Sequence, residues 1–272
     1  MQAVCAMLPR MTRASDCSCT TTIDLLPSRP LQPAFVALVE DALASLQQAL
    51  GPLLHSVYLY GSVARAQARP GVSDLDLTLV LTRPLAADEA ALLEQQRLAL
   101  QARHPEVSKV DFDIGVLADI RNPAHLYSWG YWLKHECRCI HGADLGLQFA
   151  AFAPSAAVAR AVNGDYVQVL QGYIAGIAAA QELATLRRLQ KEAARKLVRA
   201  TNVLRPAEGG GWPRSLEDYV RYFSERFPDR AERAAFFLAQ AKAPTASAED
   251  FNAQLEAFIA WMQGQAQAPA SA

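Results

Sequence analysis

Two aspartates one residue apart interrupt an otherwise apolar segment in the first half of the chain. Residues 74–81 read DLDLTLVL, which becomes almost wholly apolar after the second aspartate. An apolar run of this kind is typical of a central strand covered on both faces. Alternate residues of a strand point to the same face, so Asp74 and Asp76 are expected to project side by side while the leucines enter the core.

A second pair of aspartates has the same spacing further along the chain. Residues 107–117, VSKVDFDIGVL, alternate as a strand, with Asp111 and Asp113 on one face and Phe112 and Ile114 on the other. If this strand neighbours the first one, the carboxylates of both strands converge on one patch. This prediction depends on strand order, which the sequence alone does not fix.

Carboxylates held together repel one another unless a positive charge lies between them. Magnesium is a natural partner, because it binds carboxylate oxygens together with substrate phosphates. Asp74, Asp76, Asp111 and Asp113 are therefore candidate metal ligands. Such a patch can hold two metal ions about 3.5–4 Å apart, the arrangement used in phosphoryl displacement.

A glycine and a serine end the strand expected at residues 56–62, SVYLYGS, and open an expected helix at 62–69. Glycine allows a phosphate to approach the backbone closely, and the free N–H groups at a helix start attract anions. Gly61 and Ser62 thus form a candidate phosphate-binding turn, with Arg65 nearby as a charge partner.

The pattern of elements changes near residue 150. Before it, expected helices at 32–50, 86–103 and near 123–134 alternate with strands, which indicates an α/β domain; after it, only helices are expected, as in a bundle. The sequence predicts a tail at 1–30, a catalytic domain at 31–150, a helical domain at 151–266 and a short tail at 267–272.

Composition excludes few functions. The 272 residues are 51% apolar and carry a net charge of -1, so nucleic acid is neither indicated nor excluded as a partner. No apolar run reaches the length needed to cross a membrane, and the N-terminus lacks a signal-peptide pattern. Five cysteines, an odd number, indicate reduced thiols in the cytoplasm. No feature indicates the oligomeric state.

Basic residues line one side of an expected helix in the second half. Arg188, Lys191, Arg195 and Arg199 recur at helical spacing, opposite leucines. A solvated helix face explains this stripe. The alternative is that Lys191, Arg195 or Lys196 contacts a nucleotide triphosphate.

The sequence assigns the residues near position 130 to the fold and not to a binding site. Tyr131 and Trp132 are typical of a core, and His135-Glu136-Cys137 lacks the spacing of known zinc motifs, which favours the start of a strand.

The stretch Gly61-Ser62, eleven residues, Asp74-Leu75-Asp76 resembles the signature of the nucleotidyltransferases related to DNA polymerase beta, a group that includes the aminoglycoside- and lincosamide-modifying enzymes. The resemblance implies that the Gly-Ser turn holds nucleotide phosphates and that Asp74 and Asp76 hold Mg²⁺. It also implies a third carboxylate on a later strand. Asp111 is the first choice for it and Asp113 the alternative.

The resemblance further implies an α/β (α+β) domain with a mixed sheet, followed by a helical bundle. The expected activity is Mg²⁺-dependent transfer of a nucleoside monophosphate, AMP from ATP or another NTP, to a hydroxyl acceptor with release of pyrophosphate. Lys191 and Lys196 are the expected nucleotide contacts from the helical domain. Residues 150–272 are slightly basic, with 14 basic and 12 acidic residues, which does not suit a polycationic drug. Alternatives are transfer to protein or tRNA, and non-catalytic nucleotide binding.

Overall fold

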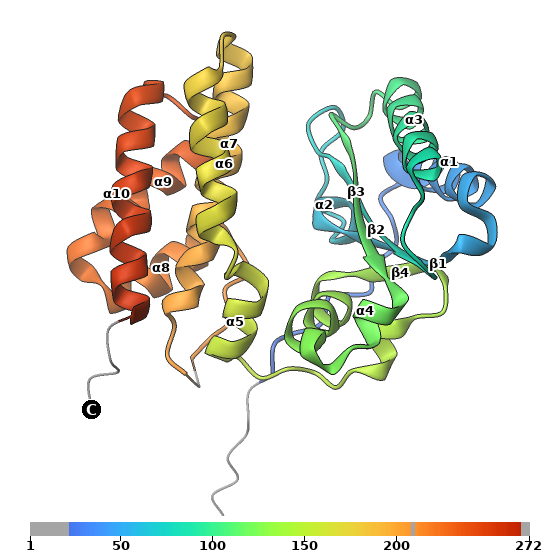
Figure 1. Cartoon of the computed structure of the whole chain (residues 1–272), viewed down its shortest axis with the longest axis horizontal. Coiled ribbons are helices and arrows are strands. Elements are labelled where there is room, and N and C mark those ends of the chain that lie inside the picture. The colour runs from blue at the N-terminus through green and yellow to red at the C-terminus, as the bar shows by residue number, and fades with distance from the viewer. Residues whose placement is uncertain (1–21, 208–209, 268–272) are drawn as a thin grey trace, which may run out of the picture.

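The structure, a computed structural model, describes residues 22–207 and 210–267 in two lobes, a sheet lobe and a helical lobe (Figure 1). Most of the predicted N-terminal tail lies outside the described residues, as do Cys5, Cys17 and Cys19. The short tail expected at the C-terminus lies there as well, except Gln267, which ends the last helix.

A four-stranded mixed sheet forms the centre of the sheet lobe. Its strands are β1 (Leu54–Tyr60), β2 (Leu75–Leu81), β3 (Val110–Val116) and β4 (Arg138–Gly142). They lie in the order β3-β2-β1-β4, and only β2 and β3 run parallel. The mixed sheet is as expected, and the strand with the first aspartate pair does neighbour the strand with the second.

Two helices cover one face of this sheet. They are α1 (Pro33–Leu50) and α3 (Ala87–Arg103), close to the ranges that the apolar spacing predicted. The leucines of β2 are fully buried between them and belong to the main core of the lobe. The aspartates alternate with these leucines, so their side chains leave the sheet on the opposite face.

Helical turns cover only part of that opposite face. They are α4 (Leu117–Arg121), η2 (Pro123–His125), η3 (Leu126–Gly130) and η4 (Trp132–Glu136), followed after β4 by η5 (Leu145–Gln148). A helix is expected near 123–134, and the chain is helical there, but η3 and η4 have π geometry and the helical stretch extends to residue 136. These turns pack on Tyr58 and Val80 and leave the aspartate end of the face uncovered by this lobe.

The helix expected at 62–69 is only one turn long. α2 spans Gly61–Ala64, and the backbone of Ala66 then takes a left-handed φ of 54°. Gln32 holds the chain beyond it, because its side-chain amide accepts from the N–H of Ala68 and donates to the carbonyl of Ala68. This tertiary contact outweighs the local helix propensity of the segment.

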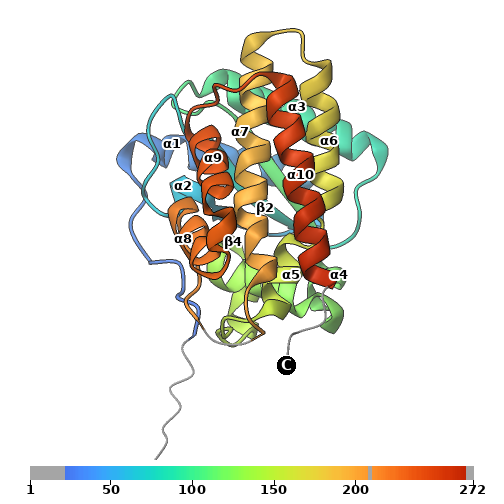
Figure 2. The same ribbon diagram turned by 90° about the vertical axis from the view of Figure 1, so that its left-hand side faces the viewer.

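The helical lobe begins after residue 155, and its helices from α6 to α10 share one core. Its elements are α5 (Ala156–Asn163), α6 (Tyr166–Ala179), α7 (Leu183–Ala200), η6 (Thr201–Leu204), α8 (Leu216–Arg226), η7 (Pro228–Arg230), α9 (Ala231–Lys242) and α10 (Ala248–Gln267). α7 contributes buried residues along its length to the bundle core. Figure 2 shows the bundle lying in front of the sheet, with α7 across from β2.

Residues 22–30 belong to the fold, which corrects their assignment to the tail. Ile23 is buried, and its N–H donates to the carbonyl of Phe152 at 2.7 Å. Ile23 also packs with Tyr131 of the sheet lobe and Val158 of α5 in a small apolar cluster that joins the lobes. The sequence missed this segment because its few apolar residues show no periodicity.

Free thiols and the absence of a membrane span were two further expectations from the sequence. No helix in these ranges has both the length and the apolar character needed to cross a membrane. Cys137 and Cys139 are free thiols, the first of them buried.

Candidate active site

The parallel pairing of β2 and β3 brings the two aspartate pairs together. Asp76 lies directly beside Asp111 in the register, and Thr78 lies beside Asp113. Asp74 immediately precedes β2 and shares the face of Asp76. The convergence expected from the sequence is therefore present in the structure.

Asp76 shows the electrostatic effect of this crowding. Burial, followed by repulsion from Asp74 and Asp111, raises the pKa of Asp76 to about 7, while Lys109 and Arg199 act in the opposite direction. Because like charges at short range disfavour ionisation, the three carboxylates form one electrostatic cluster. Arg199 comes from α7, so the helical lobe also contributes to the field at Asp76.

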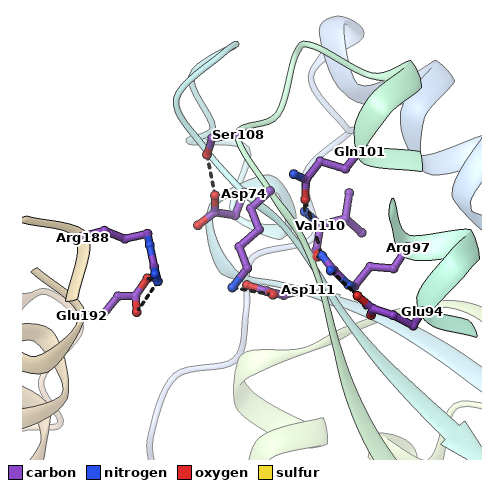
Figure 3. Close-up of polar contacts among 10 residues, drawn as sticks. Asp74, Glu94, Arg97, Gln101, Ser108, Val110, Asp111, Arg188 and Glu192 are labelled. Carbon is purple, nitrogen blue, oxygen red and sulfur yellow. Dashed lines mark hydrogen bonds and ion pairs between the residues drawn. The ribbon is translucent and has the colours of Figure 1, made fainter. Parts of the chain in front are cut away.

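The neighbouring carboxylates have local partners (Figure 3). The Ser108 hydroxyl donates to Asp74 at 2.5 Å, and the Lys109 ammonium pairs with Asp111 at 2.8 Å. The helical lobe faces them with Arg188 and Glu192 of α7, which pair with each other at 3.3 Å. Polar groups thus line both sides of the gap between the lobes.

Asp113 lies one step further along β3 than Asp111. Its side chain is exposed, yet the surrounding protein raises its pKa by desolvation. Neither Asp111 nor Asp113 lines the cavity described below, but Asp111 is the residue that pairs with Asp76. The register therefore favours Asp111 over Asp113 as the partner of the β2 aspartates.

The carboxylates are suitable but not pre-arranged ligands for a metal. Their oxygens are the hard donors that Mg²⁺ binds. Among residues 22–207 and 210–267, however, no three His, Cys, Asp or Glu side chains are grouped as a ready metal site. Asp74 and Asp111 are instead turned to Ser108 and Lys109. Metal binding would require these two carboxylates to exchange their present partners.

The Gly-Ser turn is in contact with the aspartate cluster. Gly61 has a φ of 70°, in the left-handed region that glycine adopts easily, and the space for a Cβ on it is taken by Asp76 Oδ2. Ser62 follows in the single turn of α2, and Arg65 caps that turn. The two halves of the motif, eleven residues apart in sequence, therefore meet at one point.

Tyr60 is a site residue that the sequence did not reveal. It pairs with Asp76 across β1 and β2, and its ring packs edge-on against Trp132 at 4.9 Å. Burial, and then the charges of Asp76, Asp113 and Asp111, raise the pKa of its hydroxyl. In the sequence Tyr60 reads only as one more residue of an apolar strand.

A cavity of roughly 740 Å³ lies between the two lobes at this site. This volume falls in the usual range for small-molecule sites, about 300–1,000 Å³. The sheet lobe, residues 23–29, α7 and the segment 212–219 all contribute to its wall. The lining residues from the motif and from the basic helix include Gly61, Arg65, Asp74, Asp76, Arg195, Lys196 and Arg199.

Only part of the basic stripe of α7 faces the cavity. Burial, and then repulsion from Arg199, lower the pKa of Arg195, while Asp74 and Asp76 act in the opposite direction. Lys196 pairs with Asp165 at 2.6 Å. Lys191 is not among the residues that line the cavity, although the sequence favoured it equally. Arg195 and Arg199 are therefore the α7 cations that the structure brings close to the β2 aspartates.

The aromatic and acidic residues near position 130 also line the cavity. Tyr131, Trp132, His135 and Glu136 belong to its wall, although the sequence assigned them to a core or to the start of a strand. No sequence signal would have found them, because their position depends on the π turns. The indole N–H of Trp132 donates to Thr78 in β2, which fixes this wall to the sheet.

Comparison with known proteins agrees with this site. Residues 39–131 match the family model described as "Nucleotidyltransferase domain". The chain thus carries a nucleotidyltransferase domain, and nucleotidyl transfer is its class of enzyme activity, as the Gly-Ser and Asp-x-Asp resemblance predicted. The matched segment includes β1, β2, β3 and all four strand aspartates.

The structure is similar to the crystal structure of spectinomycin adenyltransferase AAD(9) from Enterococcus faecialis with ATP and spectinomycin. The two chains are 16% identical, and the match covers 81% of this chain and 98% of that one with a TM-score of 0.51. At this identity the likeness shows a shared two-lobe fold. No curated protein matches this chain.

Proposed function

We propose that this chain transfers AMP from ATP, in a Mg²⁺-dependent reaction, to a hydroxyl acceptor that is a small molecule. One observation carries the proposal: Asp76 stands beside Asp111 in the register and against Gly61, and it lines a cavity between the two lobes. Such a site supplies positioning and charge neutralisation, which account for most of the catalysis in phosphoryl transfer. ATP is the favoured nucleotide because the structural neighbour was solved with it.

The triphosphate would lie between the Gly61-Ser62 turn and α7. Gly61 lines the cavity, and Arg65, Arg195 and Arg199 supply positive charge around it. Lys196 can join them if it releases Asp165. Lys191 would need the helix to move, so it is the weakest of the nucleotide contacts expected from the sequence.

Asp74, Asp76 and Asp111 are the residues that would hold Mg²⁺, and two ions are proposed because several carboxylates share the patch. Bound metal neutralises phosphate charge and stabilises the attacking and leaving oxygens. The high pKa of Asp76 supports this assignment, since a cluster of mutually repelling carboxylates is stabilised by an added cation. Asp113 lies two residues beyond Asp111 on β3, beside Thr78, and is the alternative candidate for the third carboxylate.

In the proposed reaction Asp111 accepts the proton of the acceptor hydroxyl. The hydroxyl oxygen forms a bond to the α-phosphorus, the bond from that phosphorus to the bridging oxygen breaks, and pyrophosphate leaves with the bonding electrons. Lys109 pairs with Asp111 in the present arrangement and would have to release this carboxylate for the reaction. The step needs only ATP and the acceptor as reactants.

The cavity favours an uncharged or anionic acceptor. Spectinomycin is bound by the structural neighbour, but the free acidic groups that would attract a polycation are few here. Asp24 is paired with Arg214, and Glu136 with Arg65. Apart from Asp74 and Asp76, the described acidic residues of the cavity wall are thus neutralised by arginines. The free thiols of Cys137 and Cys139 suit a reducing compartment, and we propose the cytoplasm.

One experiment tests the activity. ATP labelled at the α-phosphate is incubated with the full chain, Mg²⁺ and, separately, small hydroxyl compounds, tRNA and cell protein. Label on a small molecule supports the proposal, and label on protein or tRNA supports the alternative acceptors. If an ATP analogue binds but no species acquires label, the chain is a non-catalytic nucleotide-binding protein.

The aspartates provide the specificity control for this assay. Asp74→Asn and Asp76→Asn are expected to lower transfer by about a thousand-fold or more, because each removes a charge needed in the transition state. Asp119→Asn, an exposed aspartate of α4, serves as the matched control. Transfer at the wild-type rate in both cluster variants would remove the aspartates from the reaction.

A further inference from the structure

A chain of hydrogen bonds runs from the helical lobe to the phosphate-binding turn. The indole N–H of Trp212 donates to the Tyr131 hydroxyl at 2.8 Å, and that hydroxyl donates to Glu136 Oε1 at 2.7 Å. The other carboxylate oxygen of Glu136 accepts from the guanidinium of Arg65. All four residues line the cavity between the lobes.

The π geometry of the backbone makes the central link possible. Tyr131 and Glu136 are five residues apart, in the stretch where η3 continues into η4. An α-helix brings residues three and four apart onto one side, whereas a π turn has an i to i+5 repeat. The Tyr131 hydroxyl therefore reaches the Glu136 carboxylate, and this unusual turn has a structural consequence at the site.

Packing fixes the orientation of Tyr131. Its side chain is only 2% exposed, its ring stacks on His135 at 5.3 Å, and it lies 5.4 Å from the ring of Trp212. Burial, and then the neighbouring Glu136 carboxylate, raise the pKa of Tyr131, so its hydroxyl keeps the proton that it donates. The middle of the hydrogen-bond chain is thus rigid and has a fixed direction.

Arg65 is the end of the chain that faces the cavity. It directly follows the single turn of α2, and its backbone N–H bonds to the carbonyl of Gly61. Its side chain is 37% exposed, so without a partner it would sample several rotamers. A guanidinium recognises phosphate through a planar fork, which requires a defined orientation. The pair with Glu136 supplies that orientation while other N–H groups of the fork stay available.

We propose that Tyr131 and Glu136 are positioning residues that hold the Arg65 guanidinium for nucleotide binding, and that Trp212 links this arrangement to the docked helical lobe. The inference rests on the proposed function, because it assumes that Arg65 contacts the nucleotide. Binding of ATP then depends on residues that touch no phosphate. It also depends on the contact between the lobes.

The test measures the dissociation constant of Mg²⁺ with a non-hydrolysable ATP analogue by calorimetry, on the full chain. We expect Arg65→Ala to weaken binding about ten-fold or more, since it removes a hydrogen bond to a charged group. Glu136→Gln and Tyr131→Phe are expected to weaken binding three- to ten-fold. KM for ATP should rise in all three variants while kcat changes little, a split that general destabilisation of the fold would not produce.

Two further variants test whether the loss of affinity comes from this hydrogen-bond chain. Tyr127→Phe changes a 45% exposed tyrosine of the same helical stretch and is expected to bind like the wild type. Trp212→Phe retains an aromatic ring but removes the N–H donor, so it is expected to weaken binding two- to three-fold. If Tyr131→Phe lowers the melting temperature strongly, Trp212→Phe and Glu136→Gln still decide the question.

The double variant Arg65→Ala with Glu136→Gln should bind no more weakly than Arg65→Ala alone, because both changes remove the same arrangement. Additive losses would overturn the positioning role. So would wild-type affinity in Glu136→Gln and Trp212→Phe while Arg65→Ala binds weakly, a result that leaves the proposed function standing. Unchanged affinity in Arg65→Ala would overturn both the positioning role and the nucleotide contact.

Discussion

The carboxylate of Asp76 occupies the space that a side chain on Gly61 would need. Gly61 directly follows β1 and Asp76 belongs to β2, and the two come together because β1 and β2 are antiparallel neighbours, with Tyr60 opposite Asp76 in the register. The position of the Asp76 carboxylate therefore requires a glycine here. This contact joins the two halves of the Gly-Ser and Asp-x-Asp motif.

Gly61→Ala should abolish transfer and destabilise the fold. The new methyl group would overlap Asp76 Oδ2 and would impose a left-handed backbone on alanine, at a cost of about 1–2 kcal/mol before the overlap is counted. Gly172→Ala in α6 is the matched control, because a Cβ there meets nothing within 4 Å and alanine favours the helix. Thermal unfolding and the labelled-ATP assay measure both effects. A stable, active Gly61→Ala protein would contradict the close packing described here.

The cations of α7 can be separated by their position on the helix. Arg195→Gln and Arg199→Gln are each expected to weaken binding of Mg²⁺ and ATP analogue about ten-fold, or about 1.4 kcal/mol, because both line the cavity. Lys191→Gln, with the same loss of charge one turn away, should bind like the wild type. Calorimetry distinguishes these outcomes. Equal losses in all three variants would favour a diffuse electrostatic effect over direct contacts.

The contribution of Asp76 to the stability of the metal-free protein should fall as the pH rises from about 4 to about 7. The pKa of Asp76 is raised from an ordinary 3.8 to about 7, so in this window the folded state binds a proton that the unfolded state releases. Asp76→Asn removes this titration and should stabilise the metal-free protein at pH 8 by about 1–3 kcal/mol, or a few degrees in melting temperature.

Asp119→Asn, on the exposed surface, controls for the loss of one negative charge in this measurement. The comparison is made as the difference between variant and wild type at each pH, so other titrating groups cancel. The prediction is wrong if Asp76→Asn is less stable than the wild type at pH 8 and its stability has the same pH dependence. That result would show that burial and repulsion between the carboxylates do not raise the pKa of Asp76.

The contribution of His135 to folding stability is expected to change with pH in the opposite direction. Phe152 N–H donates to its Nε2, so the ring proton lies on Nδ1, which donates to the carbonyl of Asp24. Burial lowers the pKa of His135 to about 4, so between about pH 6.5 and 4 the unfolded state binds a proton that the folded state does not. Stability contributed by this residue is therefore lost as the pH falls through that window.

His135→Gln should flatten this acid limb and lower the stability at neutral pH by about 1–3 kcal/mol, because buried hydrogen bonds to residues 24 and 152 are lost. His125→Gln, on the same face of the lobe but hydrogen-bonded at the surface, is the control. Denaturant unfolding at pH 5 and pH 7.5 measures both slopes. An unchanged acid slope in His135→Gln would show that this histidine is not the titrating group.

The catalytic motif could be predicted from the sequence because its signals are local. The spacing of Asp74 with Asp76, and of Asp111 with Asp113, follows the two-residue period of a strand, and an apolar residue between each pair, Leu75 or Phe112, points to the other face. Alternation placed Ile114 on the face opposite the aspartates, and the structure leaves it 41% exposed there on the edge strand β3. The period gives the two faces of a strand, and its place in the sheet decides whether each face is covered.

The wall of the cavity opposite the sheet could not be predicted in this way. Lys191 and Arg195 have the same charge and sit on the same helix, and only the docking of α7 distinguishes them. Tyr131 and Glu136 are hydrogen-bonded because of a π turn, and no residue pattern in the sequence predicts that turn. Residues 22–30 have little periodicity but are held by His135 and Phe152 from distant parts of the chain.

The sequence by itself determined the strands, the amphipathic helices, the phosphate-turn motif and the pairs of carboxylates, since each depends on residues within a few positions of one another. Only the tertiary structure decided which carboxylate stands beside Asp76, which cations of α7 face it and how Arg65 is held. Those relationships join residues tens of positions apart. They depend on strand order and on the docking of two lobes, which no local periodicity encodes.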